Sequence, residues 1–314
     1  MTSTQFKFNG EVLRICRQFH AKSQAELGDQ IGASRQFIHQ LEIGEKIPTK
    51  IVLNALAVSL NVDSNYFNRS LLNIIRDEDC HFRKLRTTPQ WLINQIVAHG
   101  AIFNNLLAFI ETRLDLPSIN FPTYEAKSNE DIENAAEKCR QHWGLTVNQP
   151  IKNMIRVVEN AGAIVTSFEG VSTKLDALSI HRPRPVIIRS NAKQSPTRIR
   201  FDIAHECGHL VLHKGIVTGD HATEAQADRF AGAFLLPRSA FIVEFPIRRG
   251  ERIDWKLLKK FKERWKVSLQ AIIRRAYELN LIDASQYRRA HMYINKTGQR
   301  TQEEAEPSHA ENSE

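Results

Sequence analysis

The sequence has no uninterrupted apolar run approaching the 18 or more residues of a membrane-spanning helix. Its N-terminus lacks the basic segment and apolar core of a secretory signal. The four cysteines (Cys16, Cys80, Cys139 and Cys207) are scattered and form no Cys-x-x-Cys pair. A disulfide framework is therefore not expected. Together these absences predict reduced thiols, a cytoplasmic location and no membrane partner.

The balance of charge is positive, with 43 Lys and Arg residues against 35 Asp and Glu residues and a net charge of +8. This excess permits a polyanionic partner such as nucleic acid but does not demonstrate one. An apolar content of 42% and a charged content of 25% are values of globular proteins. A length of 314 residues is enough for two or three domains.

The stretch 203–210, IAHECGHL, contains His-Glu-x-x-His, a helical zinc motif of metallopeptidases. His205 and His209 are four residues apart, so on a helix both imidazoles face the same side and can bind one metal ion. Glu206 follows the first histidine and can act as general base toward a water held by zinc. The alternative is a surface helix with two solvated histidines, because five-residue matches also occur by chance.

The flanks of the motif favour a buried helix. Ser195 can cap the helix and Pro196 suits its first position, which predicts a helix from about 196 to 213. Apolar residues surround the polar triplet, namely Phe201, Ile203, Ala204, Leu210, Val211 and Leu212.

A third metal ligand is expected on a second helix over residues 223–231, which Pro237 ends. In zinc peptidases whose third ligand is glutamate, this helix carries Glu-x-x-x-Asp. Glu224 fits the zinc ligand, and Asp228 fits the aspartate that orients a ligand histidine.

Two other histidines compete for the same role. His213 continues the four-residue series but lies about 6 Å from His209 along a helix axis. Three histidines in a row do not easily surround one tetrahedral ion, so His213 is expected to line the cleft or to hydrogen-bond nearby. His221 is expected in a loop.

The segment from about Ile132 to Leu236 resembles the ImmA/IrrE family of metallopeptidases. The matching runs are Trp143-Gly144-Leu145, Pro185–Ile188, Arg200–His213, Glu224–Ala231 and Leu235–Pro237. The resemblance implies a minimal thermolysin-like α+β fold and a zinc cofactor. It also implies cleavage of specific transcriptional repressors, often in mobile elements or stress responses. Cys207 replaces an aliphatic residue usual in that family and is expected to face away from the metal.

Two further features of the peptidase segment concern substrate binding and the oxyanion. Residues 186–189 are a candidate edge strand that could bind substrate by strand addition, although an interior strand is nearly as consistent with the sequence. His213 and His181 are candidates for a second group that stabilises the oxyanion.

The N-terminal part is expected to hold a helix-turn-helix. A capping box at Ser23–Glu26 begins one helix, residues 32–34 break it, and Ser34 caps the next. The layout resembles the Cro/repressor-type domain, also called XRE. That resemblance places Arg35, Gln36 and His39 in the major groove of duplex DNA and Gln24 beside a phosphate. The alternative is a helix-turn-helix kept for dimerisation or partner docking.

The expected fold class is multidomain, with an all-α helix-turn-helix domain and an α+β zinc peptidase domain. The expected segments are a flexible lead (1–9), the helix-turn-helix domain (10–68), a helical connector (69–130), the peptidase (131–245), a basic helical region (246–300) and an acidic disordered tail (301–314). The connector either dimerises the chain or is a packed linker. The basic region either contacts nucleic acid or an acidic partner, or is a solvated cationic face.

The sequence therefore predicts a DNA-binding transcriptional regulator with zinc endopeptidase activity. Its expected partners are a duplex operator, a protein substrate that is itself a repressor, and a second copy of the chain. Two alternatives remain. In one, the peptidase-like domain only senses a ligand or partner. In the other, the chain is a self-cleaving repressor.

Overall fold

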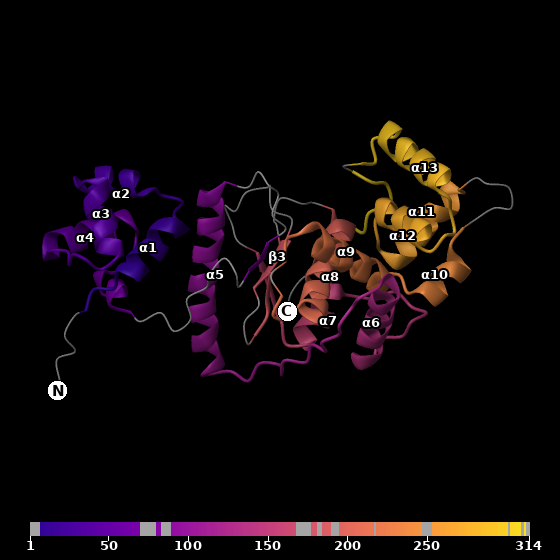
Figure 1. The fold of residues 1–314 in the computed structure, drawn as a ribbon, viewed down its shortest axis with the longest axis horizontal. Helices are drawn as coiled ribbons and strands as arrows, with labels where there is room; N and C mark the ends of the chain where they lie inside the picture. The colour runs from indigo at the N-terminus through magenta and orange to yellow at the C-terminus, as the bar shows by residue number, and fades with distance from the viewer. Residues whose placement is uncertain are drawn as a thin grey trace. The chain divides into compact units, whose positions relative to one another are not determined.

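The chain divides into two units, residues 1–80 with 85–115 and residues 81–84 with 116–314. The computed structural model describes residues 7–69, 80–82, 89–167, 177–180, 184–189, 195–216, 218–246, 253–300, 302–308 and 311 (Figure 1).

The described residues of the first unit form mainly helices joined by short loops. It contains α1 (Gly10–Phe19), α2 (Gln24–Ile31), α3 (Arg35–Glu42), α4 (Lys50–Ser59), the 3-10 helix η1 (Ser64–Asn68) and α5 (Gln90–Glu111). The predicted starts of two helices are confirmed, because the side chains of Ser23 and Ser34 each accept a backbone N–H of the helix that follows. Thr49 caps α4 in the same way. Leucine and isoleucine side chains at helical spacing then fill the core between α1, α2, α3 and α4.

Glycine permits the short connection between α2 and α3. Gly32 ends α2 with φ of 69°, a left-handed conformation that a residue with a Cβ adopts at a cost. A Cβ on Gly28 would lie 2.6 Å from the carbonyl oxygen of Ala33, so the chain returns close to α2 after the break.

Helix α5 is a single 22-residue helix, whereas the sequence predicts more than one helix between about residues 90 and 113 of the connector. By its contacts it belongs to the first unit, so it is not a separate connector. By length and mean hydropathy it is the one described helix that could cross a membrane, although the core helix of a soluble protein meets the same criterion. Asn94, Gln95, His99, Asn104 and Asn105 interrupt its apolar sequence.

The second unit combines helices with a small sheet. Its helices are α6 (Asn129–His142), α7 (Met154–Asn160), α8 (Pro196–Leu212), α9 (His221–Leu235), α10 (Arg238–Glu244), α11 (Trp255–Trp265), α12 (Leu269–Glu278) and α13 (Ala284–Lys296). The described strands are β1 (Cys80–Phe82), β2 (Ile164–Ser167), β3 (Ala177–Ile180) and β4 (Val186–Arg189). The sequence did not indicate β1, which falls in the expected connector.

The sheet has the strand order β1-β3-β4-β2. Strand β4 pairs in parallel with β2, where Ile164 lies opposite Val186, and antiparallel with β3, where Ile180 lies opposite Val186. The expectation that residues 186–189 form an edge strand is therefore wrong. Val186, Ile187 and Ile188 are buried, which suits a strand with neighbours on both sides.

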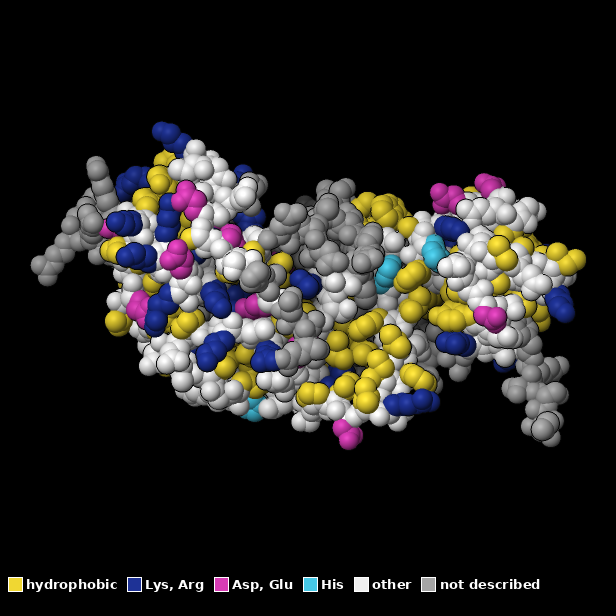
Figure 2. All heavy atoms as spheres, turned by 180° about the vertical axis from the view of Figure 1, so that it is seen from behind, with side chains coloured by type: hydrophobic (Ala, Val, Ile, Leu, Met, Phe, Trp, Pro, Cys, Tyr) yellow, Lys and Arg dark blue, Asp and Glu magenta, His cyan; other side chains and the backbone are white. Residues whose placement is uncertain are grey.

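One apolar core joins the sheet, helices α6 to α9 and the C-terminal helices. Phe234 on α9 and Trp265 on α11 are both fully buried in it. The peptidase segment and the basic helical region thus share a core, although the sequence had separated them at residue 246. In Figure 2 the Lys and Arg side chains of the C-terminal helices are interspersed with Asp and Glu side chains. On this face they do not form a single cationic patch.

The acidic tail is ordered at the positions that the structure describes, and the expectation of disorder is wrong there. Three of its glutamates accept hydrogen bonds from backbone N–H groups at helix starts. Glu303 accepts one from the first residue of α12, Glu306 accepts one from the second residue of α8, and Glu311 accepts one from the first residue of α7. Carboxylates at helix N-termini satisfy unpaired N–H groups and complement the helix dipole. Lys262 on α11, which is fully buried, binds both Glu303 and Glu306.

Candidate metal centre

Helix α8 forms where the sequence predicts it and lies in the interior. Ser195 caps it and Pro196 is its first residue, so it spans Pro196–Leu212. His205 is 3% exposed and His209 is 1% exposed. The alternative of a surface helix with solvated histidines is therefore wrong. Cys207 is buried in the apolar core, as expected for a side chain that faces away from the histidines.

Helix α9 crosses α8 at a point where both helices have small residues. A Cβ on Gly208 would lie 3.3 Å from the Cα of Ala227 and 3.1 Å from the ring of Phe230. The absence of a side chain at Gly208 thus allows the two backbones to approach closely. Glu224 and Asp228 flank Ala227 on α9, so the crossing holds both carboxylates against α8.

Three side chains converge within ligand distance of one another. The Nε2 atoms of His205 and His209 are 3.0 Å apart. Glu224 places its carboxylate oxygens 3.3 Å from Nε2 of His205 and 3.4 Å from Nε2 of His209. Two ligand atoms bound about 2.1 Å from one tetrahedral ion lie roughly 3.4 Å apart. These three residues can therefore hold one metal ion, and they are the one such cluster found among the described residues.

Glu206 is 2% exposed and follows the first histidine of the cluster. It lies close enough to His205 for its carboxylate to raise the pKa of that imidazole. The sequence prediction that Glu206 sits beside the cluster agrees with this placement.

The electrostatics of the cluster favour bound positive charge. Burial by itself would lower the pKa of His205, but hydrogen bonds to Asp228 and Glu224 outweigh burial and raise that pKa to about 10. Burial would raise the pKa of Glu224, but hydrogen bonds with His205 and His209 hold it far below the ordinary carboxyl range. For His209, burial is the largest effect and lowers the pKa. The site thus combines an ionised carboxylate with two imidazoles in a water-poor interior.

Asp228 acts on His205 from the side away from Glu224. Its Oδ1 lies 2.8 Å from Nδ1 of His205, so Nδ1 carries the proton and Nε2 faces the cluster. Its Oδ2 accepts a hydrogen bond of 3.0 Å from Nη1 of Arg274 on α12, and Arg274 also binds Glu278. The role expected for Asp228 agrees with this geometry. Arg274 was missed, because nothing in the local sequence links it to a residue 46 positions earlier.

His213 is not part of the cluster. Its Nδ1 lies 2.9 Å from Nδ1 of His209, the ring nitrogen that does not face the cluster. It therefore hydrogen-bonds nearby, one of the two roles expected for it. His221 is the exposed first residue of α9 rather than a loop residue, and it too lies outside the cluster. His181 lies outside the described residues.

The residues expected to contact DNA lie on α2 and α3. Arg35, Gln36 and His39 are exposed on α3. Gln24, the first residue of α2, is half-buried and donates a hydrogen bond of 2.7 Å to Glu42.

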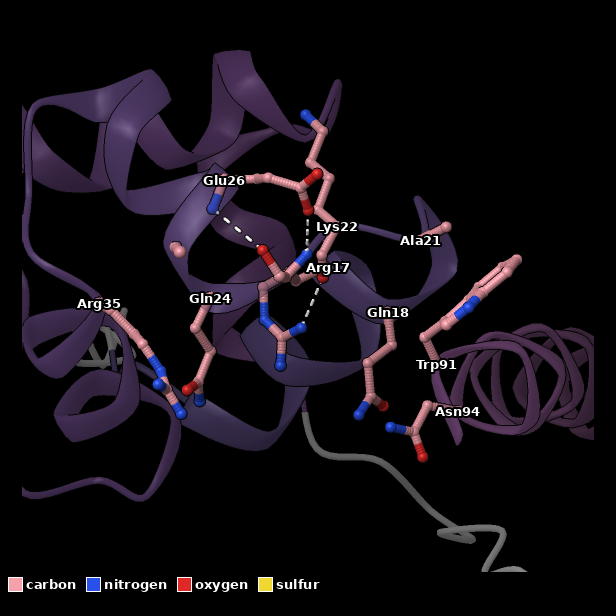
Figure 3. Close-up of a pocket in the computed structure, with 11 residues that line it drawn as sticks. Arg17, Gln18, Ala21, Lys22, Gln24, Glu26, Arg35, Trp91 and Asn94 are labelled. Atoms are coloured by element: carbon pink, nitrogen blue, oxygen red, sulfur yellow. Dashed lines mark hydrogen bonds between the residues drawn. The ribbon is translucent and has the colours of Figure 1, made fainter. Parts of the chain in front are cut away.

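These helices border a surface hollow of about 900 Å³ (Figure 3). Three cationic side chains line it, namely Arg17, Lys22 and Arg35, together with Gln24. Arg17 donates hydrogen bonds to Glu42 and to the carbonyl oxygen of Lys22, so Gln24 and Arg17 are both fixed by Glu42. Arg17 carries no sequence signal for this position, because it lies on α1 outside the expected recognition helix.

No curated protein matches the chain in a sequence comparison. A family model matches residues 158–277, from the end of α7 to the end of α12. This segment contains Glu206 and all three residues of the cluster. It is similar to the IrrE N-terminal-like domain, a peptidase family, which supports the resemblance to ImmA/IrrE proteins for this part of the chain.

Proposed function

We propose that the chain is a DNA-binding regulator whose second unit is a zinc-dependent endopeptidase. The observation that carries the proposal is the convergence of His205, His209 and Glu224, whose ligand atoms lie within 4.8 Å of one another. Glu206, one residue after the first histidine, supplies a base in the same site.

The donor set fits zinc. Two imidazole nitrogens and one carboxylate oxygen are the ligands of a catalytic site, which leaves a fourth position for water or substrate. A structural zinc site takes four protein ligands and has no need of a base. Zinc bound here would lower the pKa of a water and polarise the scissile carbonyl.

The side chains around the site have separate roles in this reaction. Glu206 accepts a proton from the attacking water and delivers it to the leaving amine. Asp228 holds His205 in one orientation and stabilises charge on that ring. The low exposure of these groups strengthens their electrostatic interactions.

The assignment of ligands is tested by measuring zinc affinity in Glu224→Ala and His221→Ala. Both residues lie in the first turn of α9, which makes them matched positions. We expect Glu224→Ala to lower zinc affinity sharply and His221→Ala to leave it unchanged. Full zinc retention in Glu224→Ala with loss in His221→Ala would overturn the choice of ligand.

We also propose that α2 and α3 form a helix-turn-helix that binds duplex DNA, with α3 as the recognition helix. The short break at Gly32 and the exposure of Arg35 and Gln36 support this role. A dimer on two half-sites one helical turn apart is the arrangement that such a motif uses. Arg35→Ala is expected to cost about 1–3 kcal/mol of discrimination. An unchanged footprint in the Arg35→Ala, Gln36→Ala double variant would reject direct base reading.

The proposed substrate is a transcriptional repressor bound at the same promoter, and the proposed location is therefore the cytoplasm. Binding to DNA beside its substrate would give the peptidase an effective concentration of roughly millimolar. The experiment incubates the zinc-loaded protein with repressors encoded beside its gene and maps fragments by mass spectrometry. Fragments of a repressor with wild type, and none with Glu206→Gln, are expected. Fragments of the chain itself would instead identify a self-cleaving repressor, and no fragments at all would favour a sensor.

A further inference from the structure

His213 and Gln226 form a hydrogen-bonded chain that begins at a backbone carbonyl and ends at a metal-site histidine. Gln226 on α9 places its Nε2 3.5 Å from the carbonyl oxygen of Ala126 and its Oε1 2.8 Å from Nε2 of His213. His213 in turn places its Nδ1 2.9 Å from Nδ1 of His209. His213 is 2% exposed, so bulk water does not replace these contacts.

The direction of every hydrogen bond in this chain follows from its first member. Only the amide nitrogen of Gln226 can face the Ala126 carbonyl, so its Oε1 faces His213 and can only accept. His213 must then carry its proton on Nε2, and its Nδ1 has a lone pair. A neutral imidazole has one N–H and one acceptor nitrogen, so Nδ1 of His209 must be the donor in the last contact. Nε2 of His209 is left with its lone pair, on the side of Glu224.

The position of His213 at the end of α8 makes this contact possible. His213 is the C-cap of the helix, with φ of −119° and ψ of 30°, and thus departs from helical geometry. Its ring therefore does not continue the row formed by His205 and His209. The centroids of the His213 and His209 rings are 5.1 Å apart, and His213 contacts the Nδ1 side of His209.

We infer that His213 and Gln226 are positioning residues that hold His209 in the tautomer required for metal binding. The inference rests on the proposed function, because it assigns a role toward the proposed metal. The carboxylate of Asp228 fixes the tautomer of His205, whereas the uncharged pair His213 and Gln226 fixes the tautomer of His209. Partners of ligand histidines typically affect metal affinity by about 10–100-fold.

The most direct test reads the tautomers themselves. Long-range proton–nitrogen correlation spectra of protein labelled with ¹⁵N-histidine distinguish Nδ1–H from Nε2–H in each ring. We expect His213 with its proton on Nε2 and zinc-loaded His209 with its proton on Nδ1. A proton on Nδ1 of His213 would reverse the relay and overturn the inference.

The second test measures zinc affinity by chelator competition in a matched pair of variants. Gln226→Leu removes the acceptor and is expected to weaken zinc binding on the order of 10-fold. Gln226→Glu gives up the 3.5 Å contact with the Ala126 carbonyl but can only accept from His213, so the direction of the relay is kept and zinc affinity is expected to stay close to wild type. The visible spectrum of the cobalt-loaded protein should change in Gln226→Leu and not in Gln226→Glu, whereas a merely structural role would leave both spectra alike.

The outcomes separate this inference from the proposed function. If wild type binds no zinc, the proposed function fails before any variant is compared. If wild type binds zinc and Gln226→Leu binds it equally tightly with an unchanged cobalt spectrum, the metal site stands and the relay is rejected. Thermal unfolding of the metal-free variants serves as the control for folding. Each variant should unfold in one cooperative transition, and the stability that Gln226→Leu loses by leaving the His213 N–H without its acceptor is measured there separately from zinc affinity.

Discussion

The acidic tail offers a sharp test of the packing, because two adjacent glutamates pair with lysines on the same helix in opposite environments. Glu303 and its partner Lys262 have side-chain exposures of 1% and 0%, with 2.8 Å between carboxylate and ammonium. Glu304 and its partner Lys259 are 60% and 30% exposed. Glu303→Ala removes one carboxylate from the buried ammonium of Lys262, whereas Glu304→Ala removes the carboxylate beside the partly exposed ammonium of Lys259.

The expected magnitudes differ several-fold. Removing one member of a buried ion pair costs about 3–5 kcal/mol, because the charge that remains is still buried. Glu306 also binds Lys262, at 2.7 Å, so the cost of Glu303→Ala should fall at the lower end, about 3 kcal/mol. Removing one member of an exposed pair costs about 0–1 kcal/mol. For a unit of roughly 200 residues, 3 kcal/mol corresponds to a fall in Tm of about 6–12 °C.

Tryptophan fluorescence can report the second unit alone. Three of the four tryptophans lie in that unit, and Trp91 on α5 is the exception. Thermal unfolding is therefore measured in a Trp91→Phe background, with Glu303→Ala and Glu304→Ala compared in parallel. Equal melting temperatures for the two variants would refute the assignment of Glu303 as the buried anchor of the tail.

Two further predictions concern charges in the same unit. Glu133 on α6 forms a bidentate pair of 2.6 Å with fully buried Arg275, so Glu133→Ala should lower the free energy of unfolding by about 3–5 kcal/mol. Glu130 lies on the same helix but is 61% exposed, so Glu130→Ala should lower it by at most about 1 kcal/mol. Similar denaturation midpoints for the two variants would contradict this. The pKa of Glu306 is also displaced: burial would raise it, but hydrogen bonds from Lys262 and other groups lower it below its ordinary value of 4.5. The stabilisation from this carboxylate is therefore present above about pH 4.5 and is lost as the pH falls through the lowered pKa. Between about pH 5 and 3, Tm should consequently fall less steeply in Glu306→Gln than in wild type. Identical slopes would show that this carboxyl does not contribute.

Local signals in the sequence were sufficient for the helices that carry the site. Ser195 and Pro196 fix the start of α8, and the four-residue spacings place His205 with His209 and Glu224 with Asp228. Each of these signals lies within one or two turns of helix. The helix starts in the first unit follow from caps for the same reason.

Features that depend on distant contacts could not be predicted in this way. The position of β4 inside the sheet depends on pairing with β2 and β3, and the sequence of a short apolar strand is compatible with either place. The tail has the composition of a disordered segment, but its glutamates meet helix N-termini and Lys262, which only the fold brings together. Gln226 and Arg274 carry no motif, and their roles follow from the neighbours that α9 and α12 acquire.

Glu206 and the metal cluster are proposed to cut peptide bonds, and this activity can be measured without knowledge of the natural substrate. A peptide library derived from a whole proteome is incubated with zinc-loaded wild type and with zinc-loaded Glu206→Gln, and new peptide ends are counted by mass spectrometry. We expect one zinc per chain in both proteins and new ends only with wild type, since glutamine nearly preserves the shape of Glu206 but cannot accept the proton. New ends at equal frequency with Glu206→Gln would contradict it, as would a fully zinc-loaded wild type that produces none.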